Sequence, residues 1–261
     1  MVGNLVMIDY SLVVGVDAKH LKQLEMVWPT WRKHKPGLLK HPMFAFFDYT
    51  QTSEMRVRAA VDHPDMMAIE WPPPGSHYPE DPSLGKFGGS QRYKMLAGFV
   101  HVPPAVVNTT YWLKLDTDVV ATGVPDWIDA GWFSELPAIV SHPWGFTKPA
   151  NQMVLLDQWA EENKLPGEPL NLVPEPGSDR VRHKRIISWC GFFHSEFTNY
   201  CSVLANGDYK YGLPVPSQDG YLWYLAQRTK QGACRCQMKT RGWEHWSTEE
   251  NIRRAVERAM A

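Results

Sequence analysis

Short apolar runs alternate with longer helix-like segments over the first 70 residues, and this alternation restricts the fold more than any other feature. The apolar runs are 11–16 (SLVVGV), 43–48 (MFAFFD) and 66–70 (MMAIE), and the helix-like segments 19–34 and 53–60 lie between them. Strands that are separated by crossover helices pair in parallel. The sequence therefore predicts an α/β protein with an open, mostly parallel sheet.

Further elements follow from periodicity and from turn residues. Pro29 lies inside the first helical segment, and we expect it to kink or divide that helix because it removes a backbone donor. The Pro- and Gly-rich residues 71–90 predict a long loop over a site. The remaining predictions are a helix at 91–100, strands at 111–115, 137–142 and 186–189, an insertion at 163–185, a helix at 221–227, an edge strand at 234–239 and a last helix after the capping box 247–250.

Composition excludes several classes of function. The chain has 261 residues and a formal net charge of −1, so it offers no overall field that would attract nucleic acid. The apolar stretch Leu5–Ile8 is far shorter than the roughly 20 residues that cross a membrane. We expect one cytoplasmic domain, 1–261, without an integral membrane segment.

The segment 111–120 (YWLKLDTDVV) carries the strongest chemical signal, because an apolar strand ends directly in Asp116 and Asp118. Ligands of open parallel sheets bind beyond the carboxyl ends of the strands. Two neighbouring carboxylates repel each other unless solvent screens them or a divalent cation neutralises them. A cation held there can bridge the phosphates of a nucleoside diphosphate, although Asp also occurs at strand ends as an ordinary turn residue.

With this motif after a series of β-α units, the chain resembles the GT-A glycosyltransferases. The resemblance implies a GT-A-like twisted sheet with helices on both faces, a nucleotide-sugar-binding half at about 1–120 and an acceptor half at about 121–261. It implies that Asp118 binds the metal directly and that Asp116 holds the donor ribose or a metal-bound water. His245, in RGWEHW, corresponds to a further metal ligand, and an imidazole beside carboxylates favours Mn²⁺ over Mg²⁺.

Donor-binding candidates follow from local chemistry for Lys86 and Arg92, and from the resemblance for the ends of the first two strands. In the segment GKFGGSQRYK, Lys86 and Arg92 suit diphosphate oxygens, although Lys86 can equally be solvated and Arg92 can pair with an acid. The other candidates are Val16, Asp17, Asp48 and Thr117. A turn-forming role is the alternative for Asp17 and Asp48.

Candidates for acceptor binding and catalysis lie in the second half. Asp219 precedes a predicted helix and matches an acid that flanks the transferred sugar, either as general base or as an orienting group; a helix N-cap is the alternative. Gly191 matches a Gly-containing strand of the family. Trp144 and Trp189 are candidate sugar platforms, and core packing is their alternative.

The resemblance predicts transfer of a sugar from a nucleotide-sugar donor, expected to be a UDP-sugar, to a glycan or another hydroxyl acceptor. One alternative is a haloacid-dehalogenase-like phosphohydrolase, since LDTDVV fits its D-x-D-x-[TV] pattern. That motif normally follows the first strand, and this chain has no Asp-Asp pair. The other alternative is a sugar-binding protein without transferase activity.

Overall fold

The computed structural model describes residues 8–70, 106–162, 164–171, 173–174, 176–208 and 218–261, with the backbone alone at 143–153, 181–188, 202–208 and 218–221. The predicted loop 71–90, the predicted helix 91–100, Lys86 and Arg92 lie outside the described residues.

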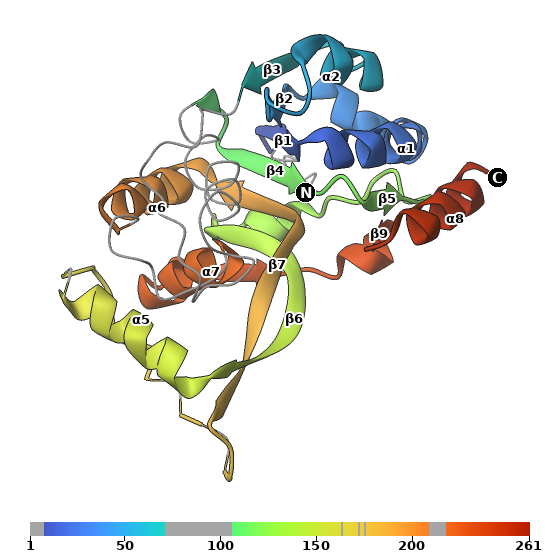
Figure 1. Cartoon of the computed structure of the whole chain (residues 1–261). Helices are drawn as coiled ribbons and strands as arrows, with labels where there is room; N and C mark the ends of the chain where they lie inside the picture. Colours follow the sequence, from blue (N-terminus) through green and yellow to red (C-terminus); the bar gives the residue numbers. More distant parts are fainter. Residues whose placement is uncertain (1–7, 71–105, 163, 172, 175, 209–217) are drawn as a thin grey trace, which may run out of the picture.

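Over residues 10–70 the described strands and helices follow the alternation that the sequence predicts (Figure 1). The sequence does not predict the helices at 150–162 and 195–208 or the short strands at 119–121 and 243–245. The strands are β1 (Tyr10–Val16), β2 (Met43–Phe47), β3 (Met66–Glu70), β4 (Tyr111–Leu115), β5 (Val119–Ala121), β6 (Ile139–Pro149), β7 (Arg180–His194), β8 (Ala233–Arg235) and β9 (Trp243–His245). The helices are α1 (Ala18–His34), α2 (Glu54–Ala60), α5 (Ala150–Glu162), α6 (Ser195–Asp208), α7 (Gln218–Arg228) and α8 (Glu249–Met260), with 3₁₀ turns η1 (Pro36–Lys40), η4 (Ala130–Phe133) and η5 (Met238–Arg241). None of the described helices has the length and apolar character needed to cross a bilayer.

A seven-stranded mixed sheet forms the centre of the molecule, in the order β3-β2-β1-β4-β7-β6-β8. The strands β3, β2, β1 and β4 are parallel, and β7 is antiparallel to both β4 and β6. A separate two-stranded sheet joins β5 to β9. Because β1, β2 and β4 are parallel, their carboxyl ends lie at one edge of the sheet, where ligands of such sheets bind.

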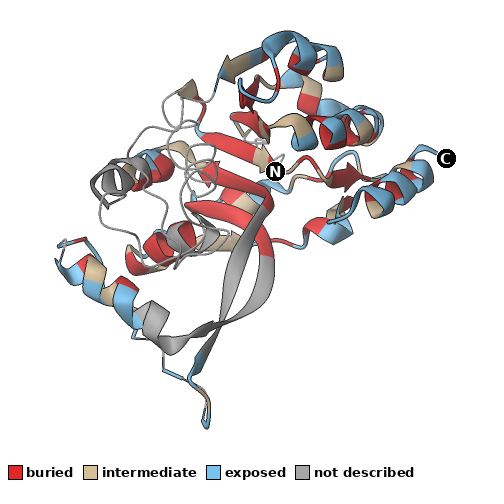
Figure 2. Ribbon diagram, viewed as in Figure 1, coloured by how far each residue is buried: buried red, intermediate tan, exposed pale blue. Residues whose placement is uncertain are grey.

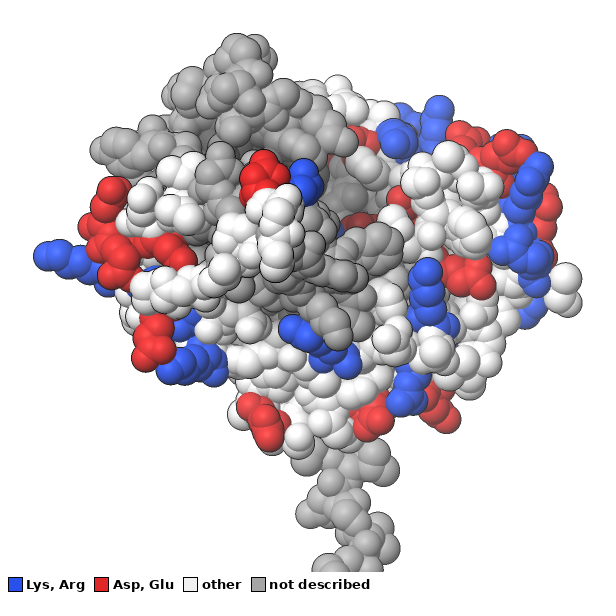
Figure 3. Space-filling model, turned by 90° about the horizontal axis from the view of Figure 1, so that it is seen from below, with Lys and Arg blue, Asp and Glu red and all other residues white. Residues whose placement is uncertain are grey.

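Hydrophobic side chains cover both faces of the sheet (Figure 2). Leu12 and Leu113 pack with α1, α2 and α8 on one face, while the alternate residues Val13 and Trp112 pack with α5, α6 and α7 on the other. This alternation follows from the period of two in a strand. On the face shown in Figure 3, basic and acidic side chains are interspersed, as expected for a chain of net charge −1.

Several boundaries differ from those that the sequence predicts. Helix α1 continues through Pro29, so Pro29 does not divide the helix, and a kink at this residue stays a prediction. The expected insertion 163–185 ends in the first part of β7, which pairs with β6 in a long ribbon. The predicted edge strand at 234–239 is confirmed only as the short strand β8, and residues from Met238 onward form η5 instead.

A buried ammonium group fastens the small sheet to α1. Lys35, which is fully buried at the end of α1, donates hydrogen bonds from Nζ to the carbonyl oxygens of Thr122 (2.9 Å), Val124 (2.5 Å) and Arg241 (2.9 Å). Three acceptors match the three donors of an ammonium. Burial lowers the pKa of Lys35 to about 8, so the group is still charged at pH 7. Gly242, with φ of +77°, lets the backbone pass close to this ammonium.

Replacing Lys35 by Met removes a donor from three carbonyl oxygens, of which only that of Thr122 is known to keep another, the N–H of Val124 (2.7 Å). We expect Lys35→Met to lower the free energy of unfolding by about 2–4 kcal/mol, since each unsatisfied buried acceptor costs about 1–3 kcal/mol and release of a buried charge offsets part of this. Urea denaturation followed by circular dichroism measures the change. Lys22→Met, at an exposed position of the same helix, is the control, and an equal effect of both substitutions would contradict this role.

Candidate metal centre

The D-x-D segment forms the turn between β4 and β5 at the carboxyl edge of the sheet. The backbone N–H of Asp116 donates to the carbonyl of Trp189 (2.8 Å), and the N–H of Val119 donates to the carbonyl of Asp116 (3.2 Å). Thr117 is buried, and its hydroxyl contacts Oε1 of Gln23 in α1 (3.1 Å). The turn is therefore fixed on both sides.

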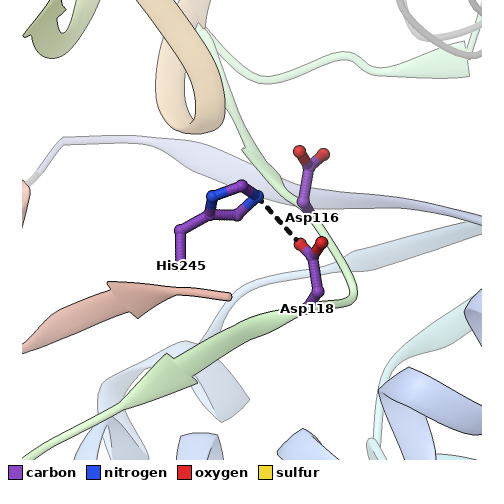
Figure 4. A group of neighbouring side chains, drawn as sticks. All are labelled: Asp116, Asp118 and His245. Carbon is purple, nitrogen blue, oxygen red and sulfur yellow. Dashed lines mark ion pairs between the residues drawn. The ribbon is translucent and has the colours of Figure 1, made fainter. Parts of the chain in front are cut away.

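His245 reaches this turn through the pairing of β5 with β9, in which Val119 lies opposite His245. Its Nε2 lies 3.3 Å from Oδ1 of Asp118 (Figure 4). One ligand atom from each of Asp116, Asp118 and His245 lies within 4.8 Å of the others, so the three residues form a group that can hold a metal ion.

The donor atoms fit a divalent cation. Oδ1 of Asp118 is buried and accepts no hydrogen bond from the described part of the chain, although His245 lies at ion-pair distance. A buried carboxylate oxygen without a hydrogen bond is costly unless another positive group faces it. Two carboxylates and an imidazole suit Mn²⁺ better than Mg²⁺, because Mg²⁺ prefers ligands that are all oxygen atoms.

Trp189 supports the centre from one side. Its ring stacks on the His245 ring with a centroid distance of 5.6 Å and an interplanar angle of 14°, and its side chain is only 6% exposed. Because its carbonyl also accepts the N–H of Asp116, Trp189 contacts both halves of the centre.

The neighbouring charged groups shift the pKa of His245 in opposite directions. Burial lowers the pKa of His245, but the carboxylates of Asp118 and Asp116 more than offset this, and the pKa is raised overall. Lys114 opposes that rise. A cation that binds here must therefore compete with a proton for His245.

Lys114 completes the centre. Lys114 lies in β4, two positions before Asp116, which directly follows the strand. Because side chains alternate along a strand, both side chains point to the same side of the sheet. The Lys114 ammonium forms an ion pair with Oδ1 of Asp116, and the lysine side chain is 15% exposed.

Comparisons with known proteins identify the fold. No family model matches the sequence, and no curated protein matches it. Core-mannan synthase A from Aspergillus fumigatus, in its Mn/GDP form, superposes with a TM-score of 0.56 at 12% identity over 96% of this chain and 84% of that one. The mannosyltransferase Ktr4p from S. cerevisiae in complex with GDP gives 0.55 at 9% identity over 98% and 82%. The galactosyltransferase LgtC in complex with donor and acceptor sugar analogs gives 0.53 at 10% identity over 96% of both chains.

This chain has the GT-A fold. The expected fold class is thus confirmed, with a mostly parallel sheet and helices on both faces. The GT-A fold places the D-x-D turn at the edge where the parallel strands end.

Three donor-binding candidates lie along this same edge. Val16 is buried in the core, and Asp17 caps α1 by accepting the N–H groups of Lys19 (2.9 Å) and His20 (2.8 Å). Asp48 is 5% exposed and accepts hydrogen bonds within its own turn. Asp17 and Asp48 therefore have the alternative turn-forming roles, and binding of a donor by these residues stays a prediction.

Of the candidate residues in the second half of the chain, the structure describes some with their side chains and others by their backbone alone. Gly191 pairs with Lys114 in β4, and a Cβ at this position would come within 3.1 Å of Ser141. Trp144 lies in β6 and Asp219 lies in the first turn of α7, both described by their backbone alone. Trp189 is a neighbour of His245, as above. The acceptor and catalytic roles of these four residues stay predictions.

Sequence reasoning missed Lys114 and Gln23. A charged residue within the apolar run YWLKL, two positions before Asp116, was a usable signal for Lys114, because i and i+2 share a face of a strand. No comparable signal existed for Gln23, which contacts Thr117 only through the packing of α1 on β4 and β5.

The cap at Asp17 can be tested by its dependence on pH. Burial tends to raise the pKa of Asp17, but hydrogen bonds and the charge of His20 hold it well below its usual value. The ionised cap therefore stabilises the fold above the unfolded-state pKa near 4, and this contribution is lost as the pH falls toward the lower folded-state pKa.

We expect Asp17→Ala to lower the free energy of unfolding by about 1 kcal/mol at pH 7 and by less at pH 3. Urea denaturation at both pH values measures this. Asp17→Asn is the control, because Asn caps helices nearly as well. A cost of Asp17→Ala that is the same at both pH values would contradict an ionised cap.

Proposed function

We propose that this protein is a metal-dependent glycosyltransferase that moves a sugar from a nucleoside-diphosphate sugar to a hydroxyl acceptor. One observation carries the proposal: Asp116, Asp118 and His245 converge at the carboxyl edge of a GT-A sheet, with a buried oxygen of Asp118 left without a hydrogen bond. The similar structures named above include mannosyl- and galactosyltransferases, one of them in an Mn/GDP form.

In this proposal Asp118 and His245 bind Mn²⁺, or Mg²⁺ in its place, and Asp116 completes the site from the other side of the turn. The bound cation would neutralise charge on the leaving diphosphate. The chain's own residues prepare this chemistry. Trp189 fixes the plane of the His245 ring by stacking, and the N–H of Asp116, bound to the Trp189 carbonyl, fixes the D-x-D turn.

The two halves of the chain have separate roles in the proposal. Residues 1–120 bind the nucleotide, since β1 and β2 end beside the D-x-D turn with Asp17 and Asp48 at their ends. Residues 121–261 bind the acceptor, and Asp219, in the first turn of α7, is the candidate general base or orienting acid. A glycan or another hydroxyl compound is the acceptor class.

The donor nucleotide is proposed to be UDP, on the resemblance to the family. Two of the similar structures are named as GDP forms, so GDP belongs in the same test. The phosphohydrolase alternative finds no support, because the fold matches GT-A enzymes and the D-x-D follows β4 instead of the first strand.

The first experiment measures metal binding. We expect Asp118→Asn to weaken Mn²⁺ binding by roughly 100-fold or more, since loss of a partner that only orients a ligand already costs about 10–100-fold. Isothermal titration with MnCl₂ gives the affinity, and the rise in melting temperature with UDP-sugar or GDP-sugar plus MnCl₂ gives donor binding.

Asp126→Asn, an exposed acid in the following loop, is the matched control. Wild-type affinity for Mn²⁺ in Asp118→Asn would contradict the metal centre. Donor binding without any hydrolysis or transfer of the sugar, measured by release of the nucleoside diphosphate, would favour the sugar-binding alternative.

The second experiment tests Asp219. We expect Asp219→Asn to lower kcat by about 10²–10⁴-fold while the Kd of the donor stays the same, because a general base acts in the chemical step. Asp179→Asn, at an exposed position, is the control. A drop in melting temperature at unchanged kcat would make Asp219 a residue that only stabilises the first turn of α7.

A further inference from the structure

Lys114 occupies an unusual position for a charged side chain. It lies in the central strand β4, whose other residues are buried, and its neighbours across the sheet are Val13 in β1 and Gly191 in β7. A partly buried ion pair gives little net stability, because desolvation offsets the attraction between the charges.

The position of Lys114 sets up a competition for Asp116. Its ammonium already pairs with Oδ1 of Asp116, one of the three residues that form the candidate metal centre. A divalent cation that binds Asp116 must displace this ammonium or tolerate it at close range. Like charges repel more strongly where water is scarce.

The net charge of the centre indicates which ligand would let the Lys114 ammonium and a divalent cation bind close together. Asp116, Asp118 and Lys114 together carry one net negative charge, and a divalent cation turns this into one net positive charge. The diphosphate of a nucleotide sugar bound to the cation brings two negative charges, which more than offset this net positive charge. A lysine is well suited to a phosphate group because its ammonium acts as a compact point charge on a flexible stem.

We propose that Lys114 pairs with Asp116 when no cation is bound and moves to the diphosphate of the donor when a divalent cation binds. Lys114 thereby couples the two ligands, so that the cation binds more tightly in the presence of the nucleoside diphosphate. This inference rests on the proposed function. By linkage, the nucleoside diphosphate must gain the same factor from the cation.

Three affinities of wild type and Lys114→Met test the coupling: MnCl₂ alone, MnCl₂ with saturating UDP or GDP, and UDP or GDP with saturating MnCl₂. We expect Lys114→Met to bind Mn²⁺ alone about 3–10-fold more tightly, because Asp116 loses its competing ammonium. We expect it to bind the nucleoside diphosphate about 10-fold more weakly, because a charged contact is lost. Because Lys114 pairs with Asp116 when no cation is bound, nucleotide binding without metal should not change, and by linkage the factor by which the nucleotide strengthens Mn²⁺ binding falls by about 10-fold.

Two further variants complete the test. Lys114→Arg keeps the positive charge and should keep most of the coupling. Lys239→Met removes an exposed positive charge from the 3₁₀ turn η5 before β9 and should leave all three affinities unchanged. Melting temperatures without ligands verify that each variant is folded.

The outcomes separate the two proposals. If Lys114→Met weakens Mn²⁺ and nucleotide binding together, or changes neither, Lys114 does not couple them and the inference is overturned while the metal centre stands. If the wild type binds neither Mn²⁺ nor Mg²⁺, the proposed function and the inference are both overturned. Tighter binding of Mn²⁺ alone together with weaker binding of the nucleoside diphosphate in Lys114→Met supports the inference.

Discussion

The buried ammonium of Lys35 holds together the parts of the chain on which the candidate site depends. Its three carbonyl acceptors belong to the segment after β5 and to the turn before β9. Trp31 adds a hydrogen bond from its indole N–H to the carbonyl of Val119 (2.7 Å), and Thr30 accepts the N–H of Ala121 (3.1 Å). Helix α1 therefore fixes the small sheet, and the small sheet brings His245 to Asp118.

The candidate centre is built from groups of opposite charge at a sheet edge that is only partly open to water. Two carboxylates, an imidazole and an ammonium lie together, and each changes the charge that the others meet. In our proposal, such a centre binds a cation and an anion together more tightly than either one alone. A metal-bound nucleoside diphosphate is a ligand of this kind.

The sequence predicted those elements that carry a local pattern. Apolar runs gave β1, β2, β3 and β4, and the D-x-D at the end of β4 identified the candidate metal centre, together with His245. Strands β5 and β9 have three residues each and show no periodicity that could be recognised. The charged start of β7 resembled an insertion, because its pairing with β6 is a tertiary interaction.

By itself, the sequence determined the order β1-α1-β2-α2-β3 and the position of the D-x-D at the end of β4, because apolar periodicity and spacing along the chain are local features. Tertiary structure alone decided that His245 faces Asp118 and that Trp189 stacks on the imidazole. These contacts join residues that are distant in sequence or depend on the exact backbone path. Local propensity does not encode them, since the packing of the whole sheet and its helices sets the distances.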